Sequence, residues 1–91
     1  MATLHMETDI ARSTQSNIMN THGQLTGMLQ SMTGAVNNLQ PSWLGNSATE
    51  FYATYDQWRS QMTGLLEQLN TLGARLQSEI AEWEAMSSKL S

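Results

Sequence analysis

Apolar residues recur every seven positions through most of this 91-residue chain, and the recurrence is interrupted once, around its single proline, Pro41. A repeat of seven is the period of the apolar seam between two packed α-helices. Pro41 has no amide hydrogen to donate and disfavours helix at Gln40, so the first helix is expected to end near Leu39. The chain is therefore predicted to be a helical hairpin, because so short an interruption leaves room only for an antiparallel turn.

Three apolar rows carry the repeat. The first helix has one such row, and the second helix has two rows that lie three residues apart, which we interpret as the a and d positions of the seam. The members of the three rows are, in order, Leu4, Ala11, Ile18, Leu25, Met32 and Leu39; Ala48, Tyr55, Met62, Leu69, Leu76, Trp83 and Leu90; and Phe51, Trp58, Leu65 and Leu72.

The companion row of the first helix is weaker. It contains Met28, Leu29, Ala35 and Val36 near the turn, but Glu7, Thr14 and Thr21 toward the N-terminus. We therefore expect tight packing of the two helices near the turn and looser packing, or fraying, where the first helix begins.

The helix boundaries follow from local signals. A single domain over 1–91 is expected, with a first helix at about 4–39, a turn at 40–47, a second helix at about 48–86 and a short tail at 87–91. Ser47 and Glu50 have the spacing of a capping box, which predicts that the second helix begins at Ala48. Arms of this length would each measure about 55 Å, so the hairpin is expected to be a rod.

Gly23, Gly27 and Gly34 lie in the interior of the first predicted helix. Each glycine disfavours the helix by about 0.5–1 kcal/mol relative to alanine. Two interpretations remain open: the glycines only soften the helix, or they allow a neighbouring helix to approach closely.

A second hairpin is needed to cover the apolar residues that flank the seam. These flanking residues, which one hairpin alone would leave exposed, are Leu29, Val36, Leu66, Ile80 and Met86. Two hairpins packed as a four-helix bundle would bury them. The predicted fold class is therefore all-α, an antiparallel two-helix hairpin that dimerises into a four-helix bundle. The residues do not distinguish a second copy from a related chain.

Composition argues against several functions. The net charge is −4 and the four basic residues are scattered, so the chain has no basic footprint for nucleic acid. It has no cysteine, and His5 and His22 are too far apart to share a local helical metal site. No matched pair of reacting groups occurs, so we expect no enzyme activity, no catalytic or metal-binding residue and no cofactor. No apolar run approaches the roughly 18 residues of a membrane span, so stable membrane insertion is not expected.

The tripeptide Trp43-Leu44-Gly45 stands in the interruption, and Ala48 and Phe51 follow it. This Trp-x-Gly motif, in the one turn of a two-helix chain of this size, resembles the WXG family of small type VII secretion substrates, the early-secreted-antigen proteins. The resemblance covers the whole chain. It implies a helical hairpin that dimerises with itself or with a related WXG chain and has no catalytic activity.

The same resemblance implies export by the type VII (ESX-like) machinery, with its secretion ATPase as a partner. Proteins of this family leave the cell folded and without a cleaved signal peptide. The N-terminus here agrees, because it lacks the charged and then apolar segments of a Sec signal. The expected location is thus extracellular, in the role of a virulence-associated or interbacterial effector that acts through protein–protein contacts.

The family's export signal pairs the Trp-x-Gly turn of one subunit with a Tyr-x-x-x-Asp/Glu motif that follows the second helix of its partner. Residues 84–91 contain no tyrosine. The string from Tyr52 to Asp56 has the right letters, but it lies in the first turns of the second helix and is interpreted as core and surface helix. The resemblance thus implies that this chain supplies the turn and that a partner chain supplies the tyrosine motif.

Trp43 and Gly45 have two interpretations that can coexist: they close the end of the hairpin, or the secretion machinery recognises them directly. Two other functions remain open beside that of a secreted substrate. One is a targeting or chaperone partner for a larger exported toxin. The other is a membrane-active effector, which the acidic chain supports poorly because it has no basic amphipathic face.

Overall fold

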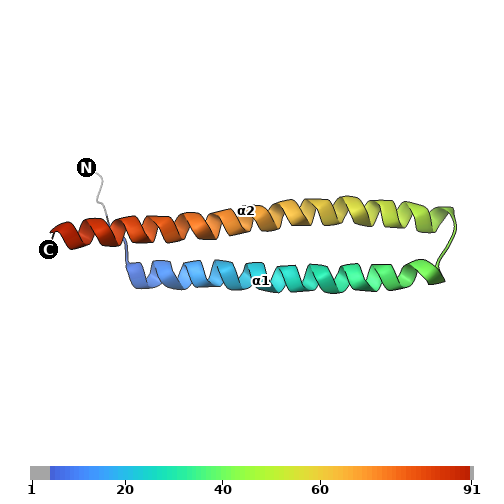
Figure 1. Cartoon of the computed structure of the whole chain (residues 1–91), viewed down its shortest axis with the longest axis horizontal. Coiled ribbons are helices and arrows are strands. Elements are labelled where there is room, and N and C mark those ends of the chain that lie inside the picture. The colour runs from blue at the N-terminus through green and yellow to red at the C-terminus, as the bar shows by residue number, and fades with distance from the viewer. Residues whose placement is uncertain (1–4, 91) are drawn as a thin grey trace.

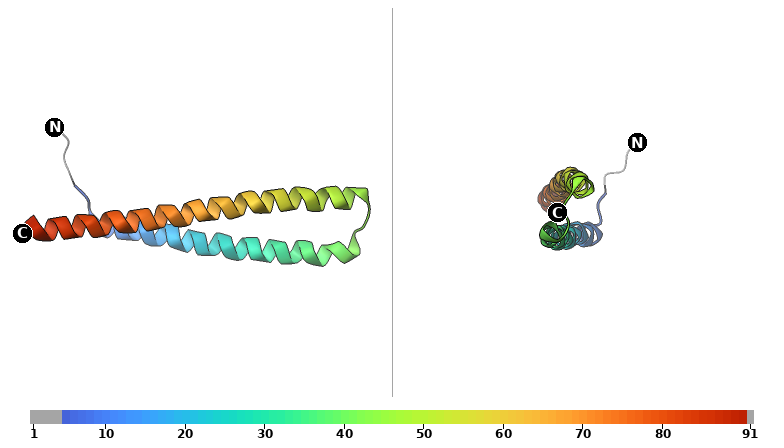
Figure 2. Two further views of the ribbon diagram at one scale, coloured as in Figure 1. Left: turned by 45° about the horizontal axis from the view of Figure 1, so that its top comes forward. Right: turned by 90° about the vertical axis from the view of Figure 1, so that its right-hand side faces the viewer.

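The computed structural model describes residues 5–90, with side chains for 5–88, and it confirms the all-α hairpin. Helix α1 spans Thr8–Leu39, a 3-10 turn η1 spans Gln40–Ser42, and helix α2 spans Asn46–Leu90. The two helices lie side by side and antiparallel, and α2, with 45 residues against 32, extends past the beginning of α1 (Figure 1). The molecule is a rod of 69 × 23 × 15 Å. Seen from its end, the two helices form a single layer (Figure 2). We call the end opposite the turn the open end.

The boundaries differ from the sequence-based ones in three places. Helix α1 begins at Thr8 rather than near residue 4, and Leu4 itself lies outside the described residues. Helix α2 continues through most of the predicted tail to Leu90, whose side chain, like Ser91, lies outside the described residues. It also begins two residues earlier than predicted, at Asn46.

This early start of α2 removes the predicted capping box. Ser47 already lies inside the helix, so it is not the residue that caps it. The amide of Thr49 donates to the carbonyl of Gly45 at 3.0 Å, which is the first bond of the helical ladder. Gly45 can take this place because its φ is +123°, a conformation that reverses the chain directly before Asn46.

On each helix, the two rows of residues that face the other helix are four residues apart. The spacing predicted from the sequence was three. On α2 the row from Ala48 is joined by a second row, whose buried members are Leu66, Gly73 and Ile80. Ala48, Leu66 and Ile80 are 1%, 8% and 5% exposed and are the buried apolar side chains of the described residues. The half-buried seam residues include Ala11, Gln15, Ile18, Met19, His22, Leu25, Leu29, Thr33 and Val36 on α1 and Tyr52, Tyr55, Met62, Leu69, Leu76 and Trp83 on α2.

The prediction that a row three residues along completes the seam within the hairpin is wrong. That row, Phe51, Trp58, Leu65 and Leu72, is 37–55% exposed. On α1 the predicted seam residues Met28, Met32 and Leu39 are exposed as well. Leu29 and Val36, which belong both to the companion row and to the predicted flanking residues, lie in the seam. Leu66 and Ile80, predicted to flank the seam, are buried in it. Of the predicted flanking residues, Met86 is the one that is exposed as predicted.

Small residues explain this choice of rows. Gly73 lies so close to α1 that a β-carbon placed on it would come 2.5 Å from Met19 Sδ and 3.2 Å from Ile18 Cγ2. Ala48, which is 1% exposed, is the small buried residue beside the turn. Two helices approach most closely where side chains are small, so the row that contains Gly73 faces α1 and the row that contains Phe51 and Trp58 is left outside.

Polar contacts between described side chains tie α1 to α2. Thr33 Oγ1 and Tyr55 Oη share a hydrogen bond of 2.7 Å toward the turn. Arg12 and Glu84 form an exposed ion pair toward the open end. Together they place Thr33 level with Tyr55 and Arg12 level with Glu84, and so fix how far each helix is shifted along the other.

The large apolar side chains left exposed on the two helices lie on one side of the hairpin. Each of these residues lies either three positions after a half-buried or buried residue or one position before one. Both spacings rotate the residue about the helix axis by about 60–100° away from the seam, and in the same direction. In two antiparallel helices that same sense leads to the same side. We call this side the apolar face; its members are Ile10, Met28, Met32 and Leu39 on α1 and Phe51, Trp58, Leu65, Leu72 and Met86 on α2.

Candidate functional site

The turn holds an ordered aromatic cluster. After η1 the backbone at Trp43 is extended, with φ −140° and ψ 105°. The Trp43 ring packs against Phe51 at 5.4 Å and against Tyr52 at 6.0 Å between ring centroids, and Phe51 and Tyr52 are themselves 5.7 Å apart. Tyr52 Oη donates a hydrogen bond of 3.1 Å to the carbonyl of Trp43. The second turn of α2 thus contacts both the side chain and the backbone of the tryptophan.

The backbone conformation at position 45 favours glycine, although the surroundings would leave room for a side chain. A β-carbon on Gly45 would meet nothing within 4 Å, but its φ of +123° is one that residues with a side chain rarely adopt. Its carbonyl also accepts the hydroxyl of Thr49 at 3.1 Å, in addition to the amide of that residue. Gly45 therefore sets the direction in which α2 leaves the turn.

The turn keeps an apolar tip open at the end of the rod. Leu44 is 83% exposed, the largest value among the exposed large apolar residues, and Trp43 is 36% exposed. Trp43 packs on α2 at the end of the hairpin, and part of its side chain stays accessible. Its recognition by the secretion machinery stays a prediction. Sequence analysis did not single out Leu44 or Tyr52, although an aromatic residue directly after Phe51 was a usable signal for the latter.

The tyrosine string of α2 is divided among three environments. Tyr52 contacts the turn, Tyr55 bonds to Thr33 between the helices, and Asp56 lies at the surface, 3.8 Å from Arg59. Its residues thus serve as core and surface helix, as interpreted from the sequence.

The predicted core residues fall into two groups. Between the helices lie Ile18, Leu25, Tyr55, Met62, Leu69 and Leu76, whereas Met28, Met32, Leu39, Phe51, Trp58, Leu65 and Leu72 lie on the apolar face. Membership of the second group in a dimer interface stays a prediction.

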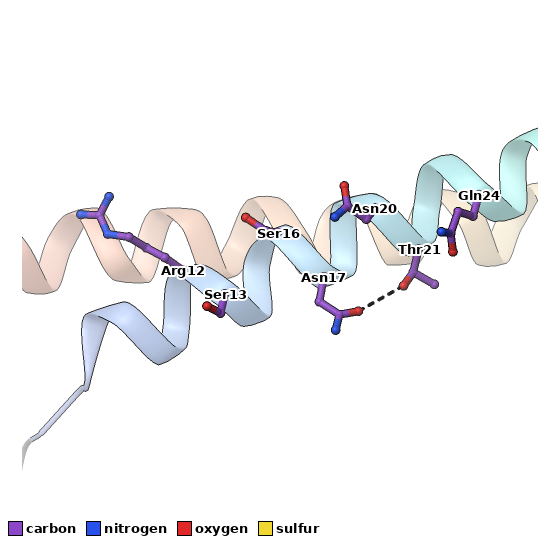
Figure 3. A pocket seen from close by; sticks show the side chains of 7 residues that line it. All are labelled: Arg12, Ser13, Ser16, Asn17, Asn20, Thr21 and Gln24. Carbon is purple, nitrogen blue, oxygen red and sulfur yellow. Dashed lines mark hydrogen bonds between the residues drawn. The ribbon is translucent and has the colours of Figure 1, made fainter.

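A shallow hollow lies along α1. It is lined by hydroxyl and amide side chains and one guanidinium: Arg12, Ser13, Ser16, Asn17, Asn20, Thr21 and Gln24 (Figure 3). Thr21 donates to Asn17 Oδ1 at 3.3 Å, and Arg12 is paired with Glu84. Over the described part of the chain, no three His, Asp or Glu side chains gather as a metal site would require. None of the described helices is long and apolar enough to cross a membrane.

A family model matches the part of the chain that contains α1, the turn and most of α2. The model WXG100, for proteins of 100 residues with a Trp-x-Gly motif, matches residues 3–85. The chain belongs to the WXG100 family. No curated protein and no solved structure matches it significantly. In this WXG100 chain the tryptophan of the motif is held by Phe51 and Tyr52, and its glycine supplies the positive φ that begins α2.

Proposed function

We propose that this WXG100 protein is a small secreted substrate of a type VII (ESX-like) secretion system. It leaves the cell folded as a helical dimer, without a cleaved signal peptide, and acts by protein–protein contact rather than by catalysis. The observation that carries the proposal is the family match over residues 3–85, with Trp43 and Gly45 in the single turn of a two-helix hairpin.

The geometry of the turn supports a role in recognition as well as in folding. The motif lies at the end of the rod, and the aromatic contacts and the Tyr52 hydrogen bond order it in advance. A pre-ordered surface loses little conformational entropy when a partner binds it. The exposed Leu44 and the open side of Trp43 would then be available to a component of the machinery, with the secretion ATPase as the expected partner.

The dimeric state is supported by the apolar face. The chain alone buries few large side chains and leaves nine large apolar residues exposed along one side of its helices. A four-helix bundle is the usual way to cover such a surface. The same face also favours the second candidate function, because the helical domain of a larger exported toxin could occupy it.

Export measured in the producing bacterium tests the proposal. The protein is expected in the culture medium of a strain with an intact secretion ATPase and only in cells of a strain that lacks this ATPase. Equal release from both strains would overturn the proposal. Trp43→Ala is expected to reduce export, and Trp83→Ala is the matched control, since it truncates a tryptophan of α2 far from the turn.

Two further measurements make the variants interpretable. Circular dichroism and the mass in solution show whether Trp43→Ala remains a folded dimer, in which case lost export indicates direct recognition. If export falls only together with helicity, the role of Trp43 is structural. Co-purification of the exported protein with a larger toxin would favour the targeting function instead.

A further inference from the structure

A groove runs between the two helices near the turn, on the side of the hairpin opposite the apolar face. Seam residues form its floor, and most of its walls are residues that directly follow a seam residue: Asn37 follows Val36, and Thr63 follows Met62. One position forward along a helix is a rotation of about 100°, in the direction opposite to the one that leads to the apolar face. A second chain on the apolar face would therefore leave this groove open.

Two adjoining hollows make up the groove. The hollow nearer the turn has a volume of about 100 Å³, the space of roughly three water molecules, and reaches Gln40. The other hollow is more open and reaches Leu29. Both are lined by Thr33, Asn37 and Arg59, so they are continuous. From position 29 to position 40 the groove measures about 16 Å along the hairpin, which equals about five residues of extended chain.

The size of the groove admits an extended chain and not a helix. An α-helix with its side chains is about 10–12 Å across. A cube with the volume of the hollow nearer the turn, about 100 Å³, has sides of about 5 Å. A polypeptide that enters this part of the groove must therefore do so in extended form.

The donors of Arg59 are unused within the hairpin. Among the described residues its guanidinium makes an ion pair with Asp56 at 3.8 Å and no hydrogen bond. The other two arginines, Arg12 and Arg75, each donate a hydrogen bond to a glutamate. A guanidinium has five N–H groups and binds a carboxylate best through two parallel hydrogen bonds. Arg59 is therefore available to a carboxylate from outside the chain.

Asp56 is a weak competitor for Arg59. Their distance of 3.8 Å exceeds that of a hydrogen bond, and 71% of the Asp56 side chain is exposed, so water screens the attraction. The wall on the side of α1 adds no charge, because the chain has no acidic or basic residue from Ser13 to Thr49. A carboxylate that bonds directly to the guanidinium can thus replace Asp56 beside it.

Amide side chains on the side of α1 suit a peptide main chain. Gln30, Asn37 and Gln40 line the groove there. Each carries a carbonyl acceptor and an NH₂ donor, which complement the N–H and C=O groups of a peptide bond. Gly34 lines the same wall, and nothing lies within 4 Å of a β-carbon placed on it, so the wall is low at this point.

We propose that this groove binds an extended peptide segment of a partner protein, with an acidic side chain of that segment held by Arg59 and its main chain held by the amides of α1. The inference goes beyond the proposed function, because it adds a binding site separate from the turn and from the apolar face. Nucleic acid fits less well, since many phosphates require several cations and the groove has one.

An NMR titration of the full isotope-labelled chain tests the binding. The probe is a pentapeptide with blocked ends, Ala-Ala-Glu-Ala-Ala, and the control peptide has glutamine at its centre. The glutamate peptide is expected to shift the side-chain amide signals of Gln30 and Asn37 and the Nε–H signal of Arg59. No binding at millimolar concentration, or equal binding of the glutamine peptide, overturns the proposal. Acetate is a third probe: if it binds as tightly as the peptide, the site takes a simple anion and the peptide assignment is wrong.

Two arginine variants separate the groove from overall charge. Arg59→Gln should weaken binding of the glutamate peptide by about tenfold or more, because it removes hydrogen bonds to a charged group. Arg75→Gln is the matched control, since it removes the same charge from the same helix outside the groove, and it should leave the affinity unchanged. Equal losses in the two variants would overturn the proposal.

The acids give a test in the opposite direction. Asp56→Asn removes the competing carboxylate and should tighten binding of the glutamate peptide. Glu79→Gln removes an equal charge beside Arg75, outside the groove, and should not. The same gain in both variants would show that only the net charge matters and would overturn the proposal.

Gly34→Leu tests the shape of the groove without changing Arg59. A leucine on this wall would occupy space that the peptide main chain needs, so binding should weaken. Gly27→Leu is the control, because it makes the same change to α1 at a position that does not line the groove. Circular dichroism establishes that both variants are helical. An unchanged affinity in Gly34→Leu overturns the proposal, and since every arm uses purified protein, export is judged separately by the secretion experiment.

Discussion

Gly73 of α2 lies directly against Met19 of α1, so close that a β-carbon on the glycine would come within 2.5 Å of Met19 Sδ. The same β-carbon would lie 3.2 Å from Ile18 Cγ2. The missing side chain therefore determines how closely the two helices pack midway between Met62 and Trp83, and it keeps the row of Leu66 and Ile80 in the interior.

Gly73→Val is expected to destabilise the hairpin by about 1–3 kcal/mol, because overpacking outweighs the gain from removing a helical glycine. Denaturant unfolding followed by circular dichroism measures this. Adding Met19→Ala should restore part of the loss, and a double-mutant cycle gives the coupling. Gly64→Ala is the control and should not destabilise, since nothing lies within 4 Å of a β-carbon there. Equal effects at the two glycines would contradict the close approach.

Gly45→Ala is expected to destabilise by about 1–3 kcal/mol, because alanine is strained at a φ of +123°. The loss should appear in thermal unfolding, and hydrogen exchange should quicken at the beginning of α2. Leu44→Ala serves as the neighbouring control. It should change the stability by no more than about 0.5 kcal/mol, because Leu44 is 83% exposed.

Gly27→Ala and Gly34→Ala decide between the two interpretations of the glycines in α1. No atom of α2 lies within 4 Å of a β-carbon at either position, so α2 is not the close neighbour. If the glycines only soften α1, each substitution should raise the free energy of unfolding by about 0.5–1 kcal/mol. A lower free energy of unfolding, together with a lower average mass in solution, would instead reveal a partner helix packed against them.

Glu84→Gln is expected to cost less than about 1 kcal/mol, although Arg12 and Glu84 form an ion pair between the two helices. Both side chains are well exposed, so water and salt screen the attraction. Unfolding at low and high salt measures the effect. Glu79→Gln, which removes the pair with Arg75 inside α2, is the matched control. A larger, salt-insensitive loss at Glu84 would indicate that the open end is closed more tightly than its exposure implies.

The turn shows where local sequence signals succeed and where they fail. Pro41 predicted the end of α1 at Leu39, and the structure agrees. The capping box at Ser47 was a weaker signal than the conformation of Gly45, which let the helix begin at Asn46. Trp43 and Gly45 were identified as the motif from sequence alone. The support from Tyr52 depends on the fold, because it requires the second turn of α2 to lie beside the carbonyl of Trp43.

The sequence by itself determined two helices, a single turn and an antiparallel hairpin, because the repeat of seven and one proline leave few alternatives. It could not determine which rows face each other, since α2 carries apolar residues in the rows of Ala48, Phe51 and Tyr52 alike. Only the tertiary structure decided this. Close approach of two helices admits Ala48 and Gly73, whereas Phe51 and Trp58 are too large for that interface and remain on the apolar face.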